Sequence, residues 1–287
     1  MKVVGLFIEP RKLKQIYYNI DNFFDVLPDC KLYFYCGKGL LQHYDKLKQK
    51  YKLLIIRELN TYNLDALTYS DFMKTRSLWE SLDGDFCLTI QTDGCLCKNS
   101  DYKIEEFFKY DYIGSNSYLK YKFLYFFQYY KKEFYNGGFS LRNISSMIKI
   151  IDKFKVEKTK KKPINLCNYP EDLYFYTCAK KFNMIIGSKY DFVSKNFCIQ
   201  TDSISNNKIF CIHKYYHDNR IDKILEYCDE FKYFLKPIFE NNSYIITNRE
   251  IKEMKNYVFY AYLIRNIILI IKYVSYLIIL YFMYLII

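Results

Sequence analysis

Short apolar runs alternate with longer amphipathic stretches through the first 250 residues. Four runs have the length and composition of buried strands: residues 3–8, 32–35, 53–56 and 86–90. Between the first two runs, apolar side chains recur at helical spacing from Leu13 to Leu27. A further helix is expected over residues 73–82, ended by Asp83 and Gly84. Repeated strand–helix–strand order predicts an α/β fold with a largely parallel sheet.

The last part of the chain is apolar over a length that suits a bilayer. Residues 267–287 contain one charged side chain, Lys272, near the start of the run. A helix of this length rises about 31 Å, close to the thickness of a bilayer core. The preceding cations, which favour a cytoplasmic location for the rest of the chain, are Lys252, Lys255 and Arg265. We therefore expect a domain over residues 1–250 and a membrane anchor helix over residues 257–287. The alternatives are a buried final helix and a loosely apolar tail that results from AT-biased codons.

The amino terminus and the cysteines give expectations about the compartment. The apolar run 3–8 is short and ends at Glu9 and Pro10, so no signal peptide is expected. Without one, the ten cysteines are expected to be free thiols in a reducing environment. Cys95 and Cys97 are the only close pair, and the chain lacks the cysteine spacing of a structural zinc site.

The net charge of +12 does not by itself indicate a nucleic-acid partner. Of the 43 basic residues, 36 are Lys, and they are spread along a chain that is also rich in Ile, Asn, Tyr and Phe. These residues have AT-rich codons, so codon bias accounts for much of the Lys. A nucleic-acid binder more often concentrates Arg and Lys on one element. A basic nucleic-acid-associated protein is therefore the weakest of the alternatives.

The expected strand over residues 86–90 leads into Gln91, Thr92 and Asp93, followed by Gly94. Ligands of open α/β sheets bind beyond the carboxyl ends of the strands, where a carboxylate can hold a divalent cation. Gln91 and Asp93 have the spacing of an Asp-x-Asp motif with Gln in the first position. The same residues are also compatible with an ordinary strand-to-turn ending.

A second motif is Asn136-Gly137-Gly138, with Arg142 four residues later. The glycines allow a close approach of the backbone to a ligand, and Asn-Gly is equally typical of a hairpin turn. Arg142 either meets a phosphate or begins the next helix.

A third motif is Pro170-Glu171-Asp172. Pro and acidic residues are favoured in the first turn of a helix, which accounts for the motif structurally. The functional alternative makes one carboxylate a general base for an acceptor hydroxyl.

A fourth motif places His213 and Lys214 at the end of a short apolar run. His213 is a candidate metal ligand and Lys214 a candidate phosphate contact, although a lone histidine is more often structural.

The order of these motifs resembles a glycosyltransferase-like family of unassigned function, DUF5672. The resemblance covers about residues 1–220. Its supporting segments are Glu9 to Lys12, the helix over residues 19–27, Tyr62 to Thr68, Ser77 to Leu82, Ile90 to Asp93, Tyr110 to Gly114, Asn136 to Arg142, Glu171-Asp172, and Phe210 to Lys214. The family often continues its Tyr-Ile-Gly element with Ala-Pro-Trp, whereas this chain has Ser115-Asn116-Ser117, a departure that affects the expected acceptor side.

The resemblance implies a GT-A-like fold, with a Rossmann-type open mixed sheet flanked by helices, that binds a nucleotide-sugar donor. It implies that Asp93 and His213 hold Mn²⁺ or Mg²⁺, and that Asp172 or Glu171 is the catalytic base. The implied donor-binding residues are Gln91, Thr92, Asn136, Gly137, Gly138, Arg142 and Lys214.

The expected function is therefore metal-assisted transfer of a sugar to an acceptor hydroxyl at a membrane. The acceptor, whether glycan, lipid or protein, and the stereochemical course are left open by the sequence. The missing first Asp of Asp-x-Asp keeps a catalytically inactive binding module as the main alternative.

Overall fold

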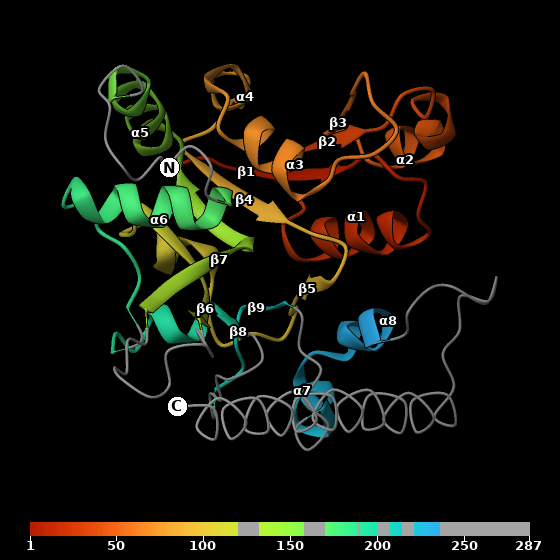
Figure 1. The fold of residues 1–287 in the computed structure, drawn as a ribbon. Coiled ribbons are helices and arrows are strands. Elements are labelled where there is room, and N and C mark those ends of the chain that lie inside the picture. The colour runs from red at the N-terminus through yellow and green to blue at the C-terminus, as the bar shows by residue number, and fades with distance from the viewer. Residues whose placement is uncertain (120–131, 158–169, 189, 200–206, 214–220, 236–287) are drawn as a thin grey trace, which may run out of the picture.

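The computed structural model describes residues 1–119, 132–157, 170–188, 190–199, 207–213 and 221–235 (Figure 1). Residues 236–287 lie outside this set, so both the predicted domain boundary at residue 250 and the predicted anchor over residues 257–287 fall outside the described residues. Among the helices that are described, none is both long and apolar enough to cross a membrane.

A six-stranded mixed sheet forms the centre of the fold, in the order β3-β2-β1-β4-β7-β6. The first four neighbours in this order run parallel, whereas β7 is antiparallel to both β4 and β6. The strands are β1 (Val3–Glu9), β2 (Lys31–Cys36), β3 (Leu54–Glu58), β4 (Phe86–Ile90), β6 (Tyr112–Leu119) and β7 (Lys132–Asn143). The expected mixed sheet of an α/β fold is thus confirmed.

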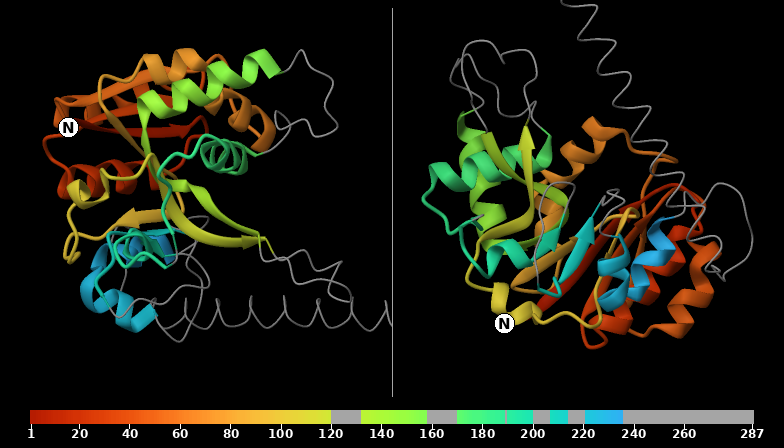
Figure 2. Two further views of the ribbon diagram at one scale, coloured as in Figure 1. Left: turned by 90° about the vertical axis from the view of Figure 1, so that its left-hand side faces the viewer. Right: turned by 90° about the horizontal axis from the view of Figure 1, so that it is seen from below.

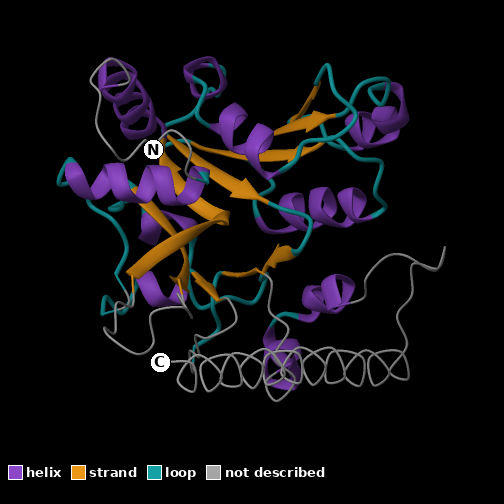
Figure 3. Cartoon of the chain, viewed as in Figure 1, coloured by secondary structure: helices purple, strands orange, loops and turns teal. Residues whose placement is uncertain are grey.

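Helices cover both faces of this sheet (Figure 3). One face packs on α1 (Gln15–Val26) and α2 (Asp45–Lys50). The other face packs on four helices, shown from two further directions in Figure 2: α3 (Ala66–Met73), α4 (Arg76–Glu80), α5 (Ile144–Glu157) and α6 (Glu171–Lys181). Alternate residues of β1 serve the two cores, with Phe7 on the α1 side and Leu6 on the α4 side. Burial on both faces explains why these strands read as continuous apolar runs.

The helix expected over residues 73–82 is shorter in the structure, because α4 spans only Arg76–Glu80 and Met73 is the last residue of the separate helix α3. Helix α3 begins earlier, where the Asp65 carboxylate accepts hydrogen bonds from the backbone N–H groups of Leu67 and Thr68 at 3.0 and 2.8 Å. It ends before Thr75, whose backbone is extended (φ −83°, ψ 130°). The indole of Trp79 donates a hydrogen bond to the Met73 carbonyl at 2.7 Å. This bond satisfies a carbonyl at the end of α3 from inside the core.

A second sheet of three short strands lies beyond the end of β4, in the order β5-β9-β8. Its strands are β5 (Gly94–Leu96), β8 (Cys198–Ile199) and β9 (Cys211–His213). Strand β5 runs antiparallel to β9, and Gly94 pairs with His213. The carboxyl-terminal helices α7 (Ile221–Tyr227) and α8 (Lys232–Leu235) contribute apolar side chains to a core cluster beside this sheet.

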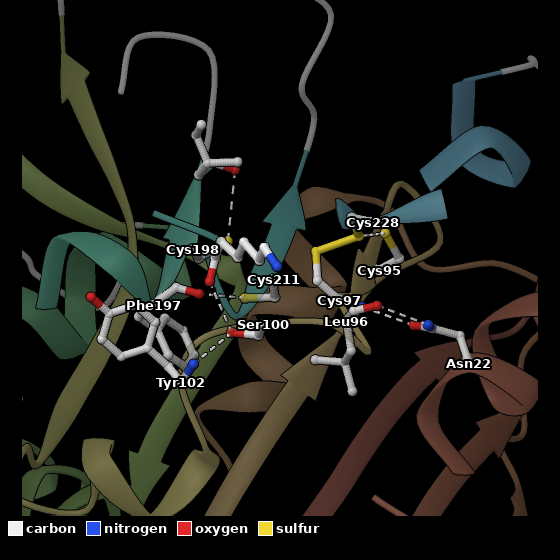
Figure 4. Close-up of a disulfide and its surroundings, with 12 residues drawn as sticks. Asn22, Cys95, Leu96, Cys97, Ser100, Tyr102, Phe197, Cys198, Cys211 and Cys228 are labelled. Carbon is white, nitrogen blue, oxygen red and sulfur yellow. Dashed lines mark hydrogen bonds between the residues drawn. A yellow bond between two sulfur atoms is a disulfide. The ribbon is translucent and has the colours of Figure 1, made fainter. Parts of the chain in front are cut away.

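A disulfide joins Cys97, just after β5, to Cys228, just after α7 (Figure 4). Their Cα atoms are 4.9 Å apart although 131 residues separate them in sequence. The expectation of free thiols is therefore wrong for this pair. The two cysteines meet because their segments, distant in sequence, pack in the same core cluster beside the three-stranded sheet. Thiols outside any disulfide are retained by Cys30, Cys36, Cys87, Cys95, Cys198 and Cys211. Cys167 lies outside the described residues.

Candidate functional site

The two predicted metal ligands are adjacent at the carboxyl end of β4. Asp93 follows that strand, and the pairing of Gly94 with His213 brings β9 alongside it. The Asp93 Oδ1 and His213 Nε2 atoms are 3.1 Å apart. The Asp93 side chain is 30% exposed, whereas that of His213 is fully buried. One carboxylate oxygen and one imidazole nitrogen, 120 residues apart in sequence, thus meet at a single point.

The Asn136-Gly137-Gly138 motif forms a bulge inside β7. Gly114 of β6 pairs with Ser140, but the next residue, Ser115, pairs with Asn136. Residues 137–139 are therefore left without partners on β6 and are pushed out of the ladder. The Asn136 Oδ1 atom accepts a hydrogen bond from the Gly138 N–H at 2.8 Å, which helps to close the bulge. The hairpin-turn alternative for this motif is thus wrong.

Gly138 lies against the Asp93–His213 pair. A Cβ atom at this position would overlap the His213 imidazole and would lie 2.6 Å from Gln91 Oε1. Gln91 is half-buried, and its Nε2 atom donates a hydrogen bond to the Tyr69 hydroxyl of α3 at 3.5 Å. Thr92, between Gln91 and Asp93, is half-buried as well. The predicted donor-side residues Gln91, Thr92 and Gly138 are therefore brought together with the predicted metal ligands.

Gly137 lies against the two acidic residues that begin α6. A Cβ atom here would overlap Glu171 Oε1 and would lie 2.6 Å from Arg142 Nη2. The Gly137 carbonyl is 2.8 Å from Thr89 Oγ1, and it accepts hydrogen bonds from Ser140 Oγ at 3.1 Å and Arg142 Nη2 at 3.3 Å. The bulge is therefore fixed by buried polar groups beneath it.

Arg142 forms an ion pair with Glu171, with Nη1 and Oε2 2.6 Å apart. The Arg142 side chain is fully buried and that of Glu171 is 6% exposed. Burial lowers the pKa of Arg142, but the Glu171 carboxylate outweighs this effect and raises it above its ordinary value. The guanidinium also lies over three aromatic rings, those of Trp79, Tyr112 and Phe175, at 5.8, 4.9 and 5.3 Å. This arrangement does not fit the predicted phosphate contact of Arg142, whose charge is already balanced inside the protein.

Asp172 differs from Glu171 in its surroundings. Its side chain is half-buried, and its Oδ1 atom accepts a hydrogen bond from the Leu173 N–H at 2.7 Å. Burial, followed by the negative charge of Glu171, raises the pKa of Asp172 to about 6. Hydrogen bonds from the Leu173 and Gly137 N–H groups and the charge of Arg142 oppose this rise in pKa. Asp172 is thus an acid whose charge changes close to neutral pH.

Several residues of the site carried no motif in the sequence. Thr89 and Ser140 meet across β4 and β7 with their hydroxyl oxygens 2.7 Å apart, and both are buried. The only sequence feature that marked them is that each is a small polar residue within an otherwise apolar segment. Tyr69 gave no such signal, because its proximity to Gln91 depends on the packing of α3. Lys214 lies outside the described residues.

A divalent cation would find two protein ligands here, Asp93 and His213. Within the described part of the chain, no group of three or more His, Cys, Asp or Glu side chains is placed to hold a metal ion. Two ligands nevertheless fit a cation such as Mg²⁺, which is commonly bound by one or two carboxylates together with water and substrate phosphates. Gly138 lets the backbone of the bulge pack against the imidazole, since a Cβ atom there would overlap the ring.

Comparisons with known proteins identify a family. Residues 54–213 match the family described as protein of unknown function DUF5672. No curated protein gives a significant match. Among solved structures, the bifunctional IspDF from Campylobacter jejuni is 13% identical with a TM-score of 0.41, over 65% of this chain and 48% of that one. The apo-form glycosyltransferase GlyE of Streptococcus pneumoniae TIGR4 is 8% identical with a TM-score of 0.41, over 66% of this chain and 46% of that one.

The chain spans about half the length of these two solved structures, and likeness at this level does not bear on activity. The family match is of a different kind, because it extends from β3 to the end of β9 and takes in both the Asp93–His213 pair and the β7 bulge. Since it covers more than half of the chain, the protein belongs to the DUF5672 family.

Proposed function

We propose that this protein is a GT-A-type glycosyltransferase that moves a sugar from a nucleotide-diphosphate donor to an acceptor hydroxyl. One observation supports this proposal above the others. The Asp93–His213 pair and the acids Glu171 and Asp172 lie on either side of the Gly137-Gly138 bulge, at the carboxyl end of β4. That edge is where open α/β sheets bind their ligands.

In this proposal Asp93 and His213 hold Mn²⁺ or Mg²⁺. When bound, the cation supplies positive charge that stabilises the leaving diphosphate. Gln91 and Thr92 line the donor side of the bulge. Gly138 keeps the bulge close to His213 and Gln91, since a Cβ atom there would overlap both side chains.

Asp172 is the proposed general base. As the acceptor oxygen bonds to the anomeric carbon, the bond from that carbon to the diphosphate oxygen breaks, and the acceptor proton passes to the Asp172 carboxylate. A pKa of about 6 leaves this carboxylate ionised at neutral pH and more basic than an ordinary aspartate. Glu171 is a weaker choice, because its carboxylate is committed to Arg142. The role we propose for Glu171 is to raise the pKa of its neighbour.

Membrane tethering is a separate proposal. We propose that residues 267–287 anchor a domain spanning residues 1–250 to the cytoplasmic side of a membrane, where a glycan, lipid or protein acceptor is modified. A chain lacking residues 257–287 should then be released into the soluble fraction. If the full-length chain and the shortened chain pellet equally after carbonate extraction, the anchor is rejected.

The enzymatic proposal is tested with the purified full-length chain, a panel of nucleotide sugars and Mn²⁺. We expect release of the nucleoside diphosphate from one donor and its loss in Asp93→Asn. The matched control is Asp25→Asn, which removes a carboxylate from an exposed position of α1 and should leave the rate unchanged. Donor binding without any turnover would favour the inactive module. The absence of binding to every donor would reject both readings.

A further inference from the structure

Glu9 is a buried carboxylate at the end of the central strand β1. Its side chain is 7% exposed, although it ends a strand whose other residues are nearly all apolar. It accepts two side-chain hydrogen bonds from Arg11, from Nε to Oε1 and from Nη2 to Oε2, both at 2.8 Å. The Arg11 backbone N–H also donates to Oε1 at 3.1 Å. A buried carboxylate thus holds an arginine fork in one orientation.

The Arg11 side chain itself is 54% exposed. The fork satisfies the buried Glu9 carboxylate without burying the arginine that forms it. A guanidinium has five N–H donors, and the fork to Glu9 uses two of them. Among the described residues the remaining three have no hydrogen-bond partner, which leaves them for the acceptors of another molecule.

Arg11 lies at the same edge of the sheet as Asp93. Strands β1 and β4 are parallel neighbours, with Phe7 paired to Ile90, so residues 9–11 and 91–93 leave the sheet side by side. The hydrogen bond with Glu9 is the largest influence that raises the pKa of Arg11, and the charge of Asp93 raises it further. The guanidinium is therefore within electrostatic range of the candidate metal ligand.

The other cations expected at this edge do not fill the same role in the structure. Arg142 is buried against Glu171, and Lys214 lies outside the described residues. Guanidinium groups are better suited than ammonium groups to the planar recognition of phosphate oxygens. A fork that is already oriented by Glu9 would lose little side-chain freedom when it binds such oxygens.

We infer that Arg11 binds the phosphate oxygens of the donor, with Glu9 as its positioning residue. The inference rests on the proposed function, and it adds to it a contact made from β1, on the opposite side of Asp93 from the Gly138 bulge. The phosphate chain would be bound between Arg11 and the cation held by Asp93 and His213. Nucleotides are then recognised at this edge by the phosphate chain and not by the base alone.

The test is calorimetry on the full-length chain with UDP, GDP, CDP and ADP in Mn²⁺, and with the matching nucleosides. For the diphosphate that the wild type binds best, Arg11→Ala should weaken affinity about 10- to 100-fold, the range of a hydrogen bond to a charged group. Affinity for the nucleoside should change by less than about twofold, since the nucleoside lacks the phosphates. Arg11→Lys keeps the positive charge but not the guanidinium fork, so its affinity for the diphosphate should lie between those of the wild type and Arg11→Ala.

The control is Lys12→Ala, which removes the same charge from an exposed neighbouring residue. Lys12→Ala should change the affinity for the diphosphate by less than about twofold, because the proposed effect of Arg11 is a direct hydrogen bond to phosphate. If long-range attraction by positive charge were the cause, both variants should weaken binding to a similar extent. If Arg11→Ala does not fold, Arg11→Lys decides the question by the same comparison of diphosphate with nucleoside.

The two proposals fail in distinguishable ways. If the wild type binds a diphosphate and Arg11→Ala binds it equally well, this inference is overturned and the proposed function stands. An equal loss of affinity for diphosphate and nucleoside also overturns it, since Arg11 would then only support the local structure. If the wild type binds none of the diphosphates, both proposals fail.

Discussion

The Arg142 guanidinium and the Glu171 carboxylate are 2.6 Å apart, and both side chains are almost entirely removed from water. Removing one partner of a buried ion pair leaves the other charge without compensation. Glu171→Gln should therefore lower the free energy of unfolding by about 3–5 kcal/mol. Urea denaturation followed by circular dichroism measures the change.

Two further variants check the cause of this loss. Replacing both partners, in Arg142→Met with Glu171→Leu, should recover most of the stability, because no unpaired charge then remains. Glu80→Gln breaks the exposed pair of Glu80 with Arg76 and should cost less than about 1 kcal/mol. If the double variant is less stable than Glu171→Gln, the explanation by an unpaired charge is wrong.

As the proposed general base, Asp172 should give the proposed transfer reaction a rising pH profile. Its pKa of about 6 means that about a tenth of the carboxylate is ionised at pH 5 and about nine-tenths at pH 7. The rate should follow this ionised fraction and reach a plateau above about pH 7. Measurement of kcat/KM from pH 4.5 to 8 tests the midpoint, and a profile flat through pH 6 would remove Asp172 as the base.

The same raised pKa predicts a pH-dependent cost in stability. The folded state holds the Asp172 proton more tightly than the unfolded state, so folding is penalised at pH values above 6, where the carboxylate is charged in both states. Below about pH 4 it is protonated in both states, and the penalty disappears. Asp172→Asn should therefore increase the free energy of unfolding on the order of 1–3 kcal/mol at pH 7.5 and have little effect at pH 4. An equal effect at both pH values would contradict the raised pKa.

Alanine substitutions at the two bulge glycines should have different effects, one on Mn²⁺ affinity and the other on stability. The Cβ atom in Gly138→Ala would press on the His213 imidazole, and we expect Mn²⁺ affinity to fall about tenfold or more. The Cβ atom in Gly137→Ala would press on Glu171, which should lower stability by about 1–3 kcal/mol and leave Mn²⁺ affinity nearly unchanged. Titration of the full-length chain with Mn²⁺ and thermal unfolding report these two effects. Equal losses of Mn²⁺ affinity in both variants would count against separate roles.

Cys95 should replace Cys97 when the latter is removed. The Cys95 Sγ atom lies 3.9 Å from the Cys228 Sγ atom, beside the existing disulfide (Figure 4). In Cys97→Ser, purified in air, dissolved oxygen should oxidise Cys95 and Cys228 to a new disulfide. Peptide mapping without reductant would detect it, and a free Cys228 thiol would refute the prediction. Removing both Cys95 and Cys97 should abolish the crosslink and cost about 2–5 kcal/mol.

The elements that could be predicted are those that local sequence determines. The apolar runs at β1, β2, β3 and β4 are buried on both faces, and such burial leaves a continuous signal in sequence. Strand β7 left a misleading signal, because Asn136-Gly137 is typical of a hairpin turn. The bulge that it forms depends on pairing with β6, and no local pattern encodes that pairing. Helix α3 was not predicted, because its start depends on the Asp65 cap and its break from α4 depends on the extended backbone of Thr75.

The sequence selected candidate site residues, but it did not indicate the contacts between them. The order of motifs selected Asp93 and His213, which the structure brings within 3.1 Å. The sequence did not indicate that Arg142 would pair with Glu171, because charge pairing depends on which side chains are buried together. The disulfide between Cys97 and Cys228 was missed for the same reason, since 131 residues separate its ends.

The β7 bulge also fixes how far apart its contacts with α6 and with His213 begin. Gly137 adjoins the acids of α6 and Gly138 adjoins His213, and these two glycines share one peptide bond. Their Cα atoms are therefore about 3.8 Å apart whatever the surrounding helices do. The contact with Glu171 of α6 and the contact with His213 of the three-stranded sheet therefore start from neighbouring residues of one short segment. The separation between the proposed base and the proposed cation ligands is thus fixed at its centre by bond lengths, and only its outer ends depend on packing.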